Sequence, residues 1–143
     1  MPAEDVTVTA RFLDVVQNNI TYETVCNVWT TQQTGGSVGI TMDIWNISSV
    51  DTGSEIDFQF DTYSVPDRWF IYYDGNLVYE TGWRGDSSYD SNPLYPGGVT
   101  SPGSGEELAI LTKLAGVDTL EIRSEGAESG TAWQYRLRSN CVD

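Results

Sequence analysis

The stretch from Arg68 to Glu80 constrains the fold more than any other part of the chain. Two runs rich in aromatic and β-branched residues flank Asp74-Gly75. Asp-Gly between such runs indicates a two-residue hairpin, because a type I′ turn needs positive φ at both central residues. In the register that follows, Ile71 opposes Val78. Both faces of the hairpin are largely apolar, so we expect it to lie inside a sheet that is covered on both sides.

The rest of the chain consists of short alternating segments joined by turns, which is typical of strands. The alternation is clearest in residues 55–63, where Ile56, Phe58 and Phe60 alternate with polar residues. Residues 106–114 also fit a helix, because a capping-box pattern precedes them, but the surrounding strands favour a strand. We predict a turn over 17–19, a polar loop over 30–37, and further strands over 6–16, 20–29, 39–47, 119–123 and 131–138.

Length and turn-rich composition predict the fold class. A chain of 143 residues is enough for one domain with a proper core, and its 14 glycines suit many short strands. We predict an all-β, single-domain antiparallel β-sandwich of about eight or nine strands, of jelly-roll or Greek-key type, covering residues 1–143. Its expected core contains Val8, Phe12, Ile40, Met42, Ile44, Phe58, Phe60, Ile71, Leu120, Ile122, Trp133 and Tyr135.

The charge of the chain limits its partners. Its 21 acidic and 7 basic residues give a formal net charge of −14. Such a charge argues against binding to nucleic acid or to an anionic membrane surface. No apolar run approaches the length of a membrane span, so we expect no membrane insertion.

The residue types give little support to catalysis. The chain has no histidine, which removes the commonest general base. Asp57 and Asp61 could pair as in a glycosidase, but along a strand they would lie about 13 Å apart, beyond the glycosidase range. We therefore expect both on a solvated face and predict that the protein is not an enzyme.

Cys26 and Cys141 are the two cysteines of the chain. They fit one disulfide that ties the last strand to an early one, and they fit two buried thiols equally well. In either case, we expect the two residues to lie close together.

Residues 83–105 form a long stretch without periodicity, and such loops inside compact domains are usually functional or disordered. Its aromatic and polar side chains can stack on sugar rings and bond hydroxyl groups. The alternative is that the aromatic residues hold the loop against the edge of the sheet. We predict a ligand- or partner-binding surface made of Trp83, Arg84, Tyr89, Asn92 and Tyr95.

Asp86 and Asp90 make the same loop a candidate calcium site, because carboxylates are hard oxygen ligands. Their spacing matches no EF-hand loop, and surface aspartates are usually only solvated. The sequence therefore predicts no cofactor, with calcium at Asp86 and Asp90 as the alternative.

Three segments carry a family resemblance: residues 65–75, residues 79–85, and Gly130 to Tyr135 before Cys141. Together they resemble small β-sandwich domains of virion proteins from marine tailed bacteriophages and of secreted bacterial proteins. The resemblance covers the second half of the chain and consists of hairpin and core residues. It implies a non-enzymatic surface module that serves attachment, decoration or glycan contact.

Two functional hypotheses follow. The first is a virion surface protein of a tailed bacteriophage, such as a decoration, tail or fibre component, which forms a homo-oligomer or contacts other virion proteins or surface glycans. The second is a carbohydrate-binding module of a secreted bacterial enzyme, with calcium as a stabilising ion. The first five residues carry no signal-peptide pattern, which favours the virion surface as the location.

Overall fold

The computed structural model describes residues 15–35 and 38–141. This part of the chain is all-β, as predicted, apart from a short 3-10 helix, η2 (Ser87–Tyr89). It contains no helix that is long and apolar enough to cross a membrane. Its strands are β2 (Val15–Glu23), β3 (Thr30–Gly35), β4 (Gly39–Asn46), β5 (Glu55–Asp61), β6 (Asp67–Tyr73), β7 (Asn76–Glu80), β8 (Ser104–Thr112), β9 (Thr119–Gly126) and β10 (Ala132–Ser139).

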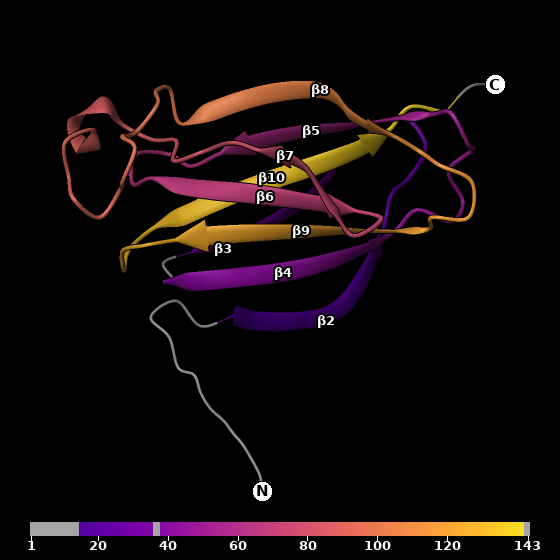
Figure 1. Ribbon diagram of the computed structural model, residues 1–143, viewed down its shortest axis with the longest axis horizontal. Helices are drawn as coiled ribbons and strands as arrows, with labels where there is room; N and C mark the ends of the chain where they lie inside the picture. Colours follow the sequence, from indigo (N-terminus) through magenta and orange to yellow (C-terminus); the bar gives the residue numbers. More distant parts are fainter. Residues whose placement is uncertain (1–14, 36–37, 142–143) are drawn as a thin grey trace, which may run out of the picture.

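The strands form two sheets that pack face to face (Figure 1). One sheet has the order β3-β10-β5-β8, and the other has the order β2-β4-β9-β6-β7. β2 and β4 run parallel, whereas the other neighbouring pairs are antiparallel. From β4 onwards the chain repeatedly crosses between the two layers, which gives the predicted β-sandwich.

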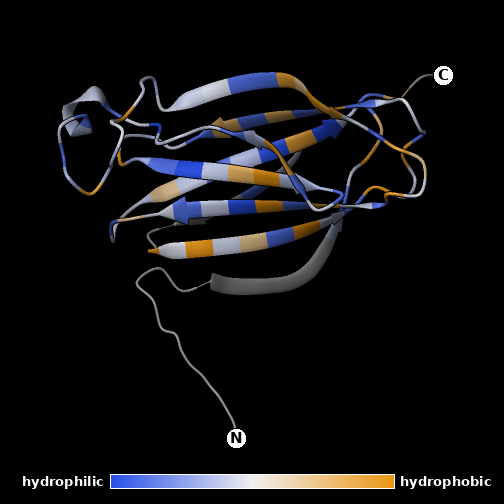
Figure 2. Ribbon diagram, in the orientation of Figure 1, coloured by the Kyte–Doolittle hydropathy of each residue, from blue (hydrophilic) through white to orange (hydrophobic). Residues whose placement is uncertain are grey.

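The core lies between the sheets and is filled by every second residue of the strands. Figure 2 shows hydrophobic and hydrophilic residues alternating along several of them. The predicted core residues Val8 and Phe12 lie outside the described part of the chain. The other predicted core residues that the structure confirms as buried are Phe58, Phe60, Ile71, Leu120, Ile122, Trp133 and Tyr135.

Strand β4 turns the opposite face to the core from the one predicted. Ile40, Met42 and Ile44 are only half-buried and lie on the outer face of the five-stranded sheet. Asp43 and Trp45 point inward instead, with 2% and 0% of their surface exposed. The prediction is wrong because alternation favours the face with three apolar residues, whereas the inward face carries Trp45 together with the aspartate Asp43.

Hydrogen bonds compensate the burial of Asp43. The Tyr135 hydroxyl, which comes from the opposite sheet, donates to Asp43 Oδ2 at 2.5 Å and accepts from Trp45 Nε1 at 3.0 Å. Burial and the neighbouring carboxylate raise the pKa of Tyr135 well above its usual value. The network links the two sheets, because Tyr135 lies in one sheet and Asp43 and Trp45 lie in the other. Without these hydrogen bonds, the three buried polar groups would be unsatisfied.

The central hairpin forms β6 and β7 as predicted. Asp74 and Gly75 occupy its tight turn with φ angles of 54° and 76°. A register shift follows, so that Ile71 pairs with Tyr79 and not with Val78. The expectation of cover on both faces is wrong, because β7 is an edge strand and leaves Val78 37% exposed.

The first strands of the described chain differ most from the prediction. The expected turn at 17–19 lies inside β2, and the expected strand at 20–29 already ends at Glu23. The expected polar loop at 30–37 contains β3, which pairs with β10. Threonine, glutamine and glycine bury little apolar surface, so the partner strand and not local hydrophobicity defines β3. The expected strand at 6–16 lies mostly outside the described residues.

Strands β8, β9 and β10 lie close to the predicted segments. β8 covers residues 104–112, so the strand interpretation of this segment is confirmed over the helical one. β9 continues to Gly126, three residues beyond the predicted end. Between β7 and β8 the chain forms the expected long irregular loop, which lies at one end of the sandwich (Figure 1).

Candidate functional site

The four-stranded sheet has a polar outer face. The inward residues of β5 and β10 fill the core, so alternation places Gln59, Asp61, Gln134 and Arg136 on the opposite face. The antiparallel register sets Gln134 beside Asp61 and Arg136 beside Gln59. Two amides, a carboxylate and a guanidinium group therefore meet in the middle of this sheet.

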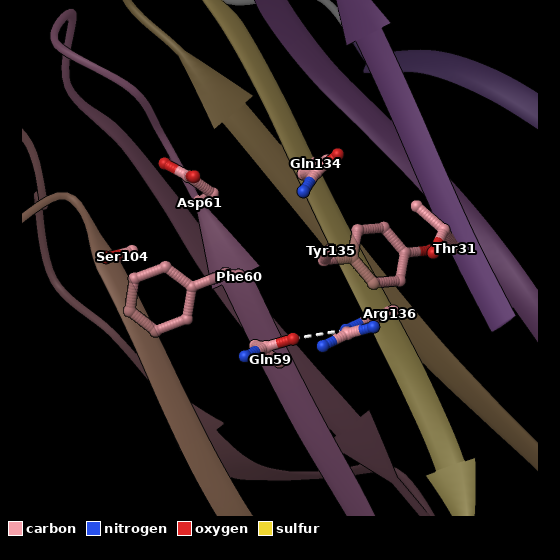
Figure 3. Close-up of a pocket in the computed structure, with 8 residues that line it drawn as sticks. All are labelled: Thr31, Gln59, Phe60, Asp61, Ser104, Gln134, Tyr135 and Arg136. Carbon is pink, nitrogen blue, oxygen red and sulfur yellow. Dashed lines mark hydrogen bonds between the residues drawn. The ribbon is translucent and has the colours of Figure 1, made fainter. Parts of the chain in front are cut away.

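These side chains line a pocket of about 260 Å³, which we call the sheet pocket (Figure 3). The flanking strands β3 and β8 add the hydroxyl groups of Thr31 and Ser104. Two core residues also border the pocket, but they are almost fully buried and form its floor. The lining residues that the structure describes are Thr31, Gln59, Phe60, Asp61, Ser104, Gln134, Tyr135 and Arg136.

Arg136 is held in position by neighbouring side chains. Its Nε donates a hydrogen bond to Gln59 (Figure 3), and its guanidinium carbon lies 4.6 Å from the centroid of the Trp29 ring. Arg138 stacks on the same ring at 4.4 Å, and its Nη2 lies 2.7 Å from Asp57 Oδ2. The outer face thus carries a fixed row of side chains, and fixed groups lose little entropy when a ligand binds.

Asp57 anchors this row, contrary to the prediction that it lies on a solvated face. The residue is only 3% exposed. Burial by itself raises the pKa of its carboxyl, but hydrogen bonds from Asn140, Arg138 and the Ala109 N–H outweigh burial and hold the pKa of Asp57 below its usual value. Asp57 is therefore ionised at neutral pH and keeps Arg138 in place.

The sheet pocket offers several hydrogen-bonding groups. Gln134 adds a side-chain amide, which can both donate and accept hydrogen bonds. Thr31 and Ser104 add hydroxyl groups, and Arg136 adds a planar donor. Asp61 is the only carboxylate among the lining residues, whereas a glycosidase uses two. The arrangement suits recognition of hydroxyl groups.

The predicted loop site packs against the sandwich. Trp83 and Tyr95 are 5% and 1% exposed, and their ring centroids lie 5.0 Å apart in a small core that includes Val99. The Tyr95 hydroxyl donates to Glu128, and burial raises the pKa of Tyr95 well above its usual value. The expectation that these aromatic residues are exposed is wrong, and their contacts agree with the alternative that they hold the loop to the sheet.

The remaining predicted contact residues bond within the chain. Arg84 donates to the carbonyl oxygen of Pro102 at 3.1 and 3.2 Å. Asn92 Oδ1 accepts a backbone N–H of the loop at 2.9 Å. Tyr89 packs edge-on against Tyr95, with ring centroids 5.9 Å apart. These contacts do not bring the predicted set into one cavity, and its role in binding stays a prediction.

Asp86 and Asp90 each bond the backbone of the loop. Asp86 Oδ1 accepts the Ser88 N–H at 2.9 Å, which holds the pKa of Asp86 below its usual value. Asp90 Oδ1 accepts the Val99 N–H at 2.9 Å. Within the described part of the chain, no three acidic, cysteine or histidine side chains gather closely enough to hold a metal ion. Calcium at Asp86 and Asp90 stays a prediction.

Cys26 and Cys141 form a disulfide with their Cα atoms 5.4 Å apart, so the predicted closeness is confirmed. Asn27 reinforces the junction, because its Oδ1 accepts the Cys141 N–H at 3.1 Å and its own N–H donates to Ser139 O at 2.8 Å. The bridge ties the turn after β2 to the end of β10, in the sheet that carries the sheet pocket.

Sequence reasoning missed the sheet pocket. The alternation over 131–138 places Gln134 and Arg136 on one polar face, which is a usable signal. No local pattern shows which strands flank that face. Thr31 was not a candidate, because residues 30–37 read as a loop.

No protein-family model and no curated protein matches the chain. Among solved structures, the pre-peptidase C-terminal domain of a collagenase from Bacillus anthracis is similar, with a TM-score of 0.47 and 11% sequence identity. The match covers 92% of this chain and 100% of that domain. The function of this β-sandwich therefore has to be argued from its own geometry.

Proposed function

We propose that this protein is a non-catalytic glycan-binding module that acts outside the cytoplasm, with the sheet pocket as its binding site. The observation that carries the proposal is the combination of the Gln134 amide in the sheet pocket with a guanidinium group held in place at Arg136. Sugars present many hydroxyl groups, each of which both donates and accepts. A rigid surface of amides, hydroxyls and one guanidinium group complements them without a conformational change.

The disulfide supports the extracellular location. Disulfides persist in secreted proteins and on virion and cell surfaces, and they are rare in the cytosol. Such a module fits the two settings that the sequence suggests, the surface of a phage virion and a secreted bacterial enzyme. The glycan contact is common to both settings.

We expect the protein to bind at least one of three neutral polysaccharides: a β-glucan, a xylan or a galactomannan. Gln134→Ala should weaken this binding roughly tenfold, because it removes hydrogen bonds worth about 1–1.5 kcal/mol. Affinity gel electrophoresis identifies the polysaccharide that slows the migration of the protein, and isothermal titration calorimetry measures the binding affinity.

Thr112→Ala is the matched control, because Thr112 is exposed and pairs with Glu55 at the other end of the β5–β8 pair. This variant should bind like the wild type. Both variants should unfold at the wild-type temperature, since neither truncates a buried side chain. Equal binding by Gln134→Ala and wild type, or binding to none of the three polysaccharides, would contradict the proposal.

A second candidate function, contact with further protein subunits, is favoured by the outer face of the five-stranded sheet. Ile40, Met42 and Ile44 form a half-exposed apolar stripe on this face, and Leu77 is 44% exposed at the edge of the same sheet. Apolar patches on a sheet surface often mark protein contacts. This observation supports the virion hypothesis, in which copies of the chain assemble.

If the stripe mediates assembly, the wild type should sediment as an oligomer at micromolar concentration. Ile44→Gln and Leu77→Glu should each shift the population to monomer, because they place polar groups in the contact. Leu108→Glu is the control, since Leu108 is 59% exposed on β8 of the other sheet. A wild type that stays monomeric at all concentrations in analytical ultracentrifugation would exclude self-assembly through this face.

A further inference from the structure

A second pocket borders the sheet pocket at the end of β5. It measures about 310 Å³, and we call it the loop pocket. Its walls come from the turn after β5 and from both ends of the long loop. Its polar groups are hydroxyls and one carboxylate, so it resembles the sheet pocket in chemistry. The lining residues are Tyr63, Ser64, Gly85, Asp86, Ser87, Ser101, Pro102 and Gly103.

Residues that line the two pockets are neighbours in the chain and in space. Asp61 lines the sheet pocket, and its Oδ1 accepts the N–H of Tyr63 in the loop pocket at 2.8 Å. Ser104 also lines the sheet pocket, pairs with Asp61 across the two strands, and directly follows Gly103 of the loop pocket. The loop pocket therefore lies next to the end of the sheet pocket at which β5 ends.

Tyr63 is the most conspicuous residue of the loop pocket. Its side chain is 52% exposed and its φ angle is 59°, a left-handed conformation that bulky residues rarely adopt. Such backbone strain persists only where the surroundings enforce it, and it is concentrated at binding sites. Here the Thr62 hydroxyl donates to Tyr63 O at 3.2 Å, and a Cβ on Gly103 would lie only 2.5 Å from that same oxygen.

The strained backbone therefore presents an aromatic ring to solvent beside a set of hydroxyl groups. Single exposed aromatic residues are common on protein surfaces and need no explanation. Tyr63 differs because its backbone is closely packed, since Gly103 leaves no room for a side chain against Thr62 and Tyr63 O. These contacts hold the backbone of Tyr63, from which the half-exposed ring borders the loop pocket as a surface on which a sugar can stack.

We infer that a single neutral, unbranched oligosaccharide spans both pockets, with the ring of Tyr63 stacked on a sugar in the loop pocket. This inference rests on the proposed glycan-binding function. The chain carries a net charge of −14, Asp61 offsets Arg136 in the sheet pocket, and Asp86 is the charged residue among those lining the loop pocket. These features disfavour an anionic polysaccharide. Two adjoining pockets require a ligand longer than the few sugar units that one of them holds.

The test measures how affinity depends on ligand length. Oligosaccharides of two, four and six sugars, prepared from the same β-glucan, xylan and galactomannan, are titrated into the wild type by calorimetry. Tyr63→Asn removes the ring and retains a residue that tolerates the left-handed conformation. Tyr63→Phe keeps the ring. Gln134→Ala reports on the sheet pocket alone.

The hexasaccharide should bind the wild type roughly tenfold more tightly than the disaccharide, the gain expected of one added stacking contact. Tyr63→Asn should abolish that gain and leave disaccharide binding unchanged, and Tyr63→Phe should retain it. Gln134→Ala should weaken both oligosaccharides.

An affinity that does not depend on length, or a Tyr63→Asn variant that binds the hexasaccharide like the wild type, would overturn the inference. The proposed function would survive that result as long as Gln134→Ala still weakens binding. Tighter binding to the anionic polysaccharide alginate than to every neutral oligosaccharide would also overturn the inference. Absence of all binding would overturn the proposed function itself.

Discussion

Removal of the Cys26–Cys141 disulfide is expected to lower the free energy of unfolding by about 5 kcal/mol. The bridge joins residues 115 apart in the sequence, and breaking so large a loop returns a correspondingly large conformational entropy to the unfolded chain. The native contacts around the bridge add to the effect, because Cys26 also pairs with Ser139 of β10 as an isolated β-bridge.

Urea unfolding of the Cys26→Ser, Cys141→Ser double variant measures this loss. Wild type kept in reductant serves as the control and should unfold at the same urea concentration as the double variant. Cys26 is exposed, so reductant can reach the bridge without prior unfolding. A loss below about 1 kcal/mol would show that the unfolded chain gains little freedom, contrary to the loop-entropy account.

Asp67→Asn is expected to raise stability at neutral pH, by up to about 4 kcal/mol at pH 7. Asp67 begins β6 and is fully buried. Its Oδ1 accepts the Thr131 hydroxyl at 2.5 Å, whereas Oδ2 has no partner among the described residues. Burial raises the pKa of Asp67 to about 8, although the Thr131 hydrogen bond acts in the opposite direction.

The sign of the pH dependence follows from the two states of this carboxyl. In the unfolded chain Asp67 ionises near pH 4, whereas in the folded protein it keeps its proton up to about pH 8. Between these values the unfolded state binds fewer protons, so rising pH favours unfolding, and the loss levels off above about pH 8. Asparagine cannot ionise, so Asp67→Asn does not lose stability in this way as the pH rises.

Urea unfolding of both proteins from about pH 4.5 to about pH 9 tests the expectation. The stability difference between Asp67→Asn and wild type should be smallest at the acid end and should grow up to about pH 8. Thr131→Val removes the hydrogen bond that lowers the pKa of Asp67. The stability of this variant should therefore keep falling to a higher pH than that of the wild type. Parallel stability profiles for wild type and Asp67→Asn would contradict the account.

Elements with strong local patterns were predicted correctly. In β5, Ile56, Phe58 and Phe60 alternate with polar residues, and only one face can be the core. The Asp74-Gly75 turn depends on two adjacent residues that tolerate positive φ. Such signals depend on neighbours in the sequence, so they can be read without the fold.

The errors arise where local patterns are ambiguous. Strand β4 places three apolar residues outward, and its inward aspartate, Asp43, is acceptable in the core because Tyr135 of the opposite sheet donates to it. β3 has almost no apolar residues and exists as the pairing partner of β10. In the long loop, Trp83 looked exposed because its packing partner Tyr95 lies twelve residues further along the chain.

By itself, the sequence determined the all-β class, the central hairpin, the inward face of several strands and the closeness of Cys26 to Cys141. Each of these depends on alternation, turn chemistry or the scarcity of cysteine. Only the tertiary structure decided the strand order β3-β10-β5-β8, which brings Thr31 near one end of the chain beside Arg136 near the other. Sheet order arises from long-range pairing of backbone groups that are the same in every residue, so side-chain patterns cannot encode it locally, and the sheet pocket exists only after that order is set.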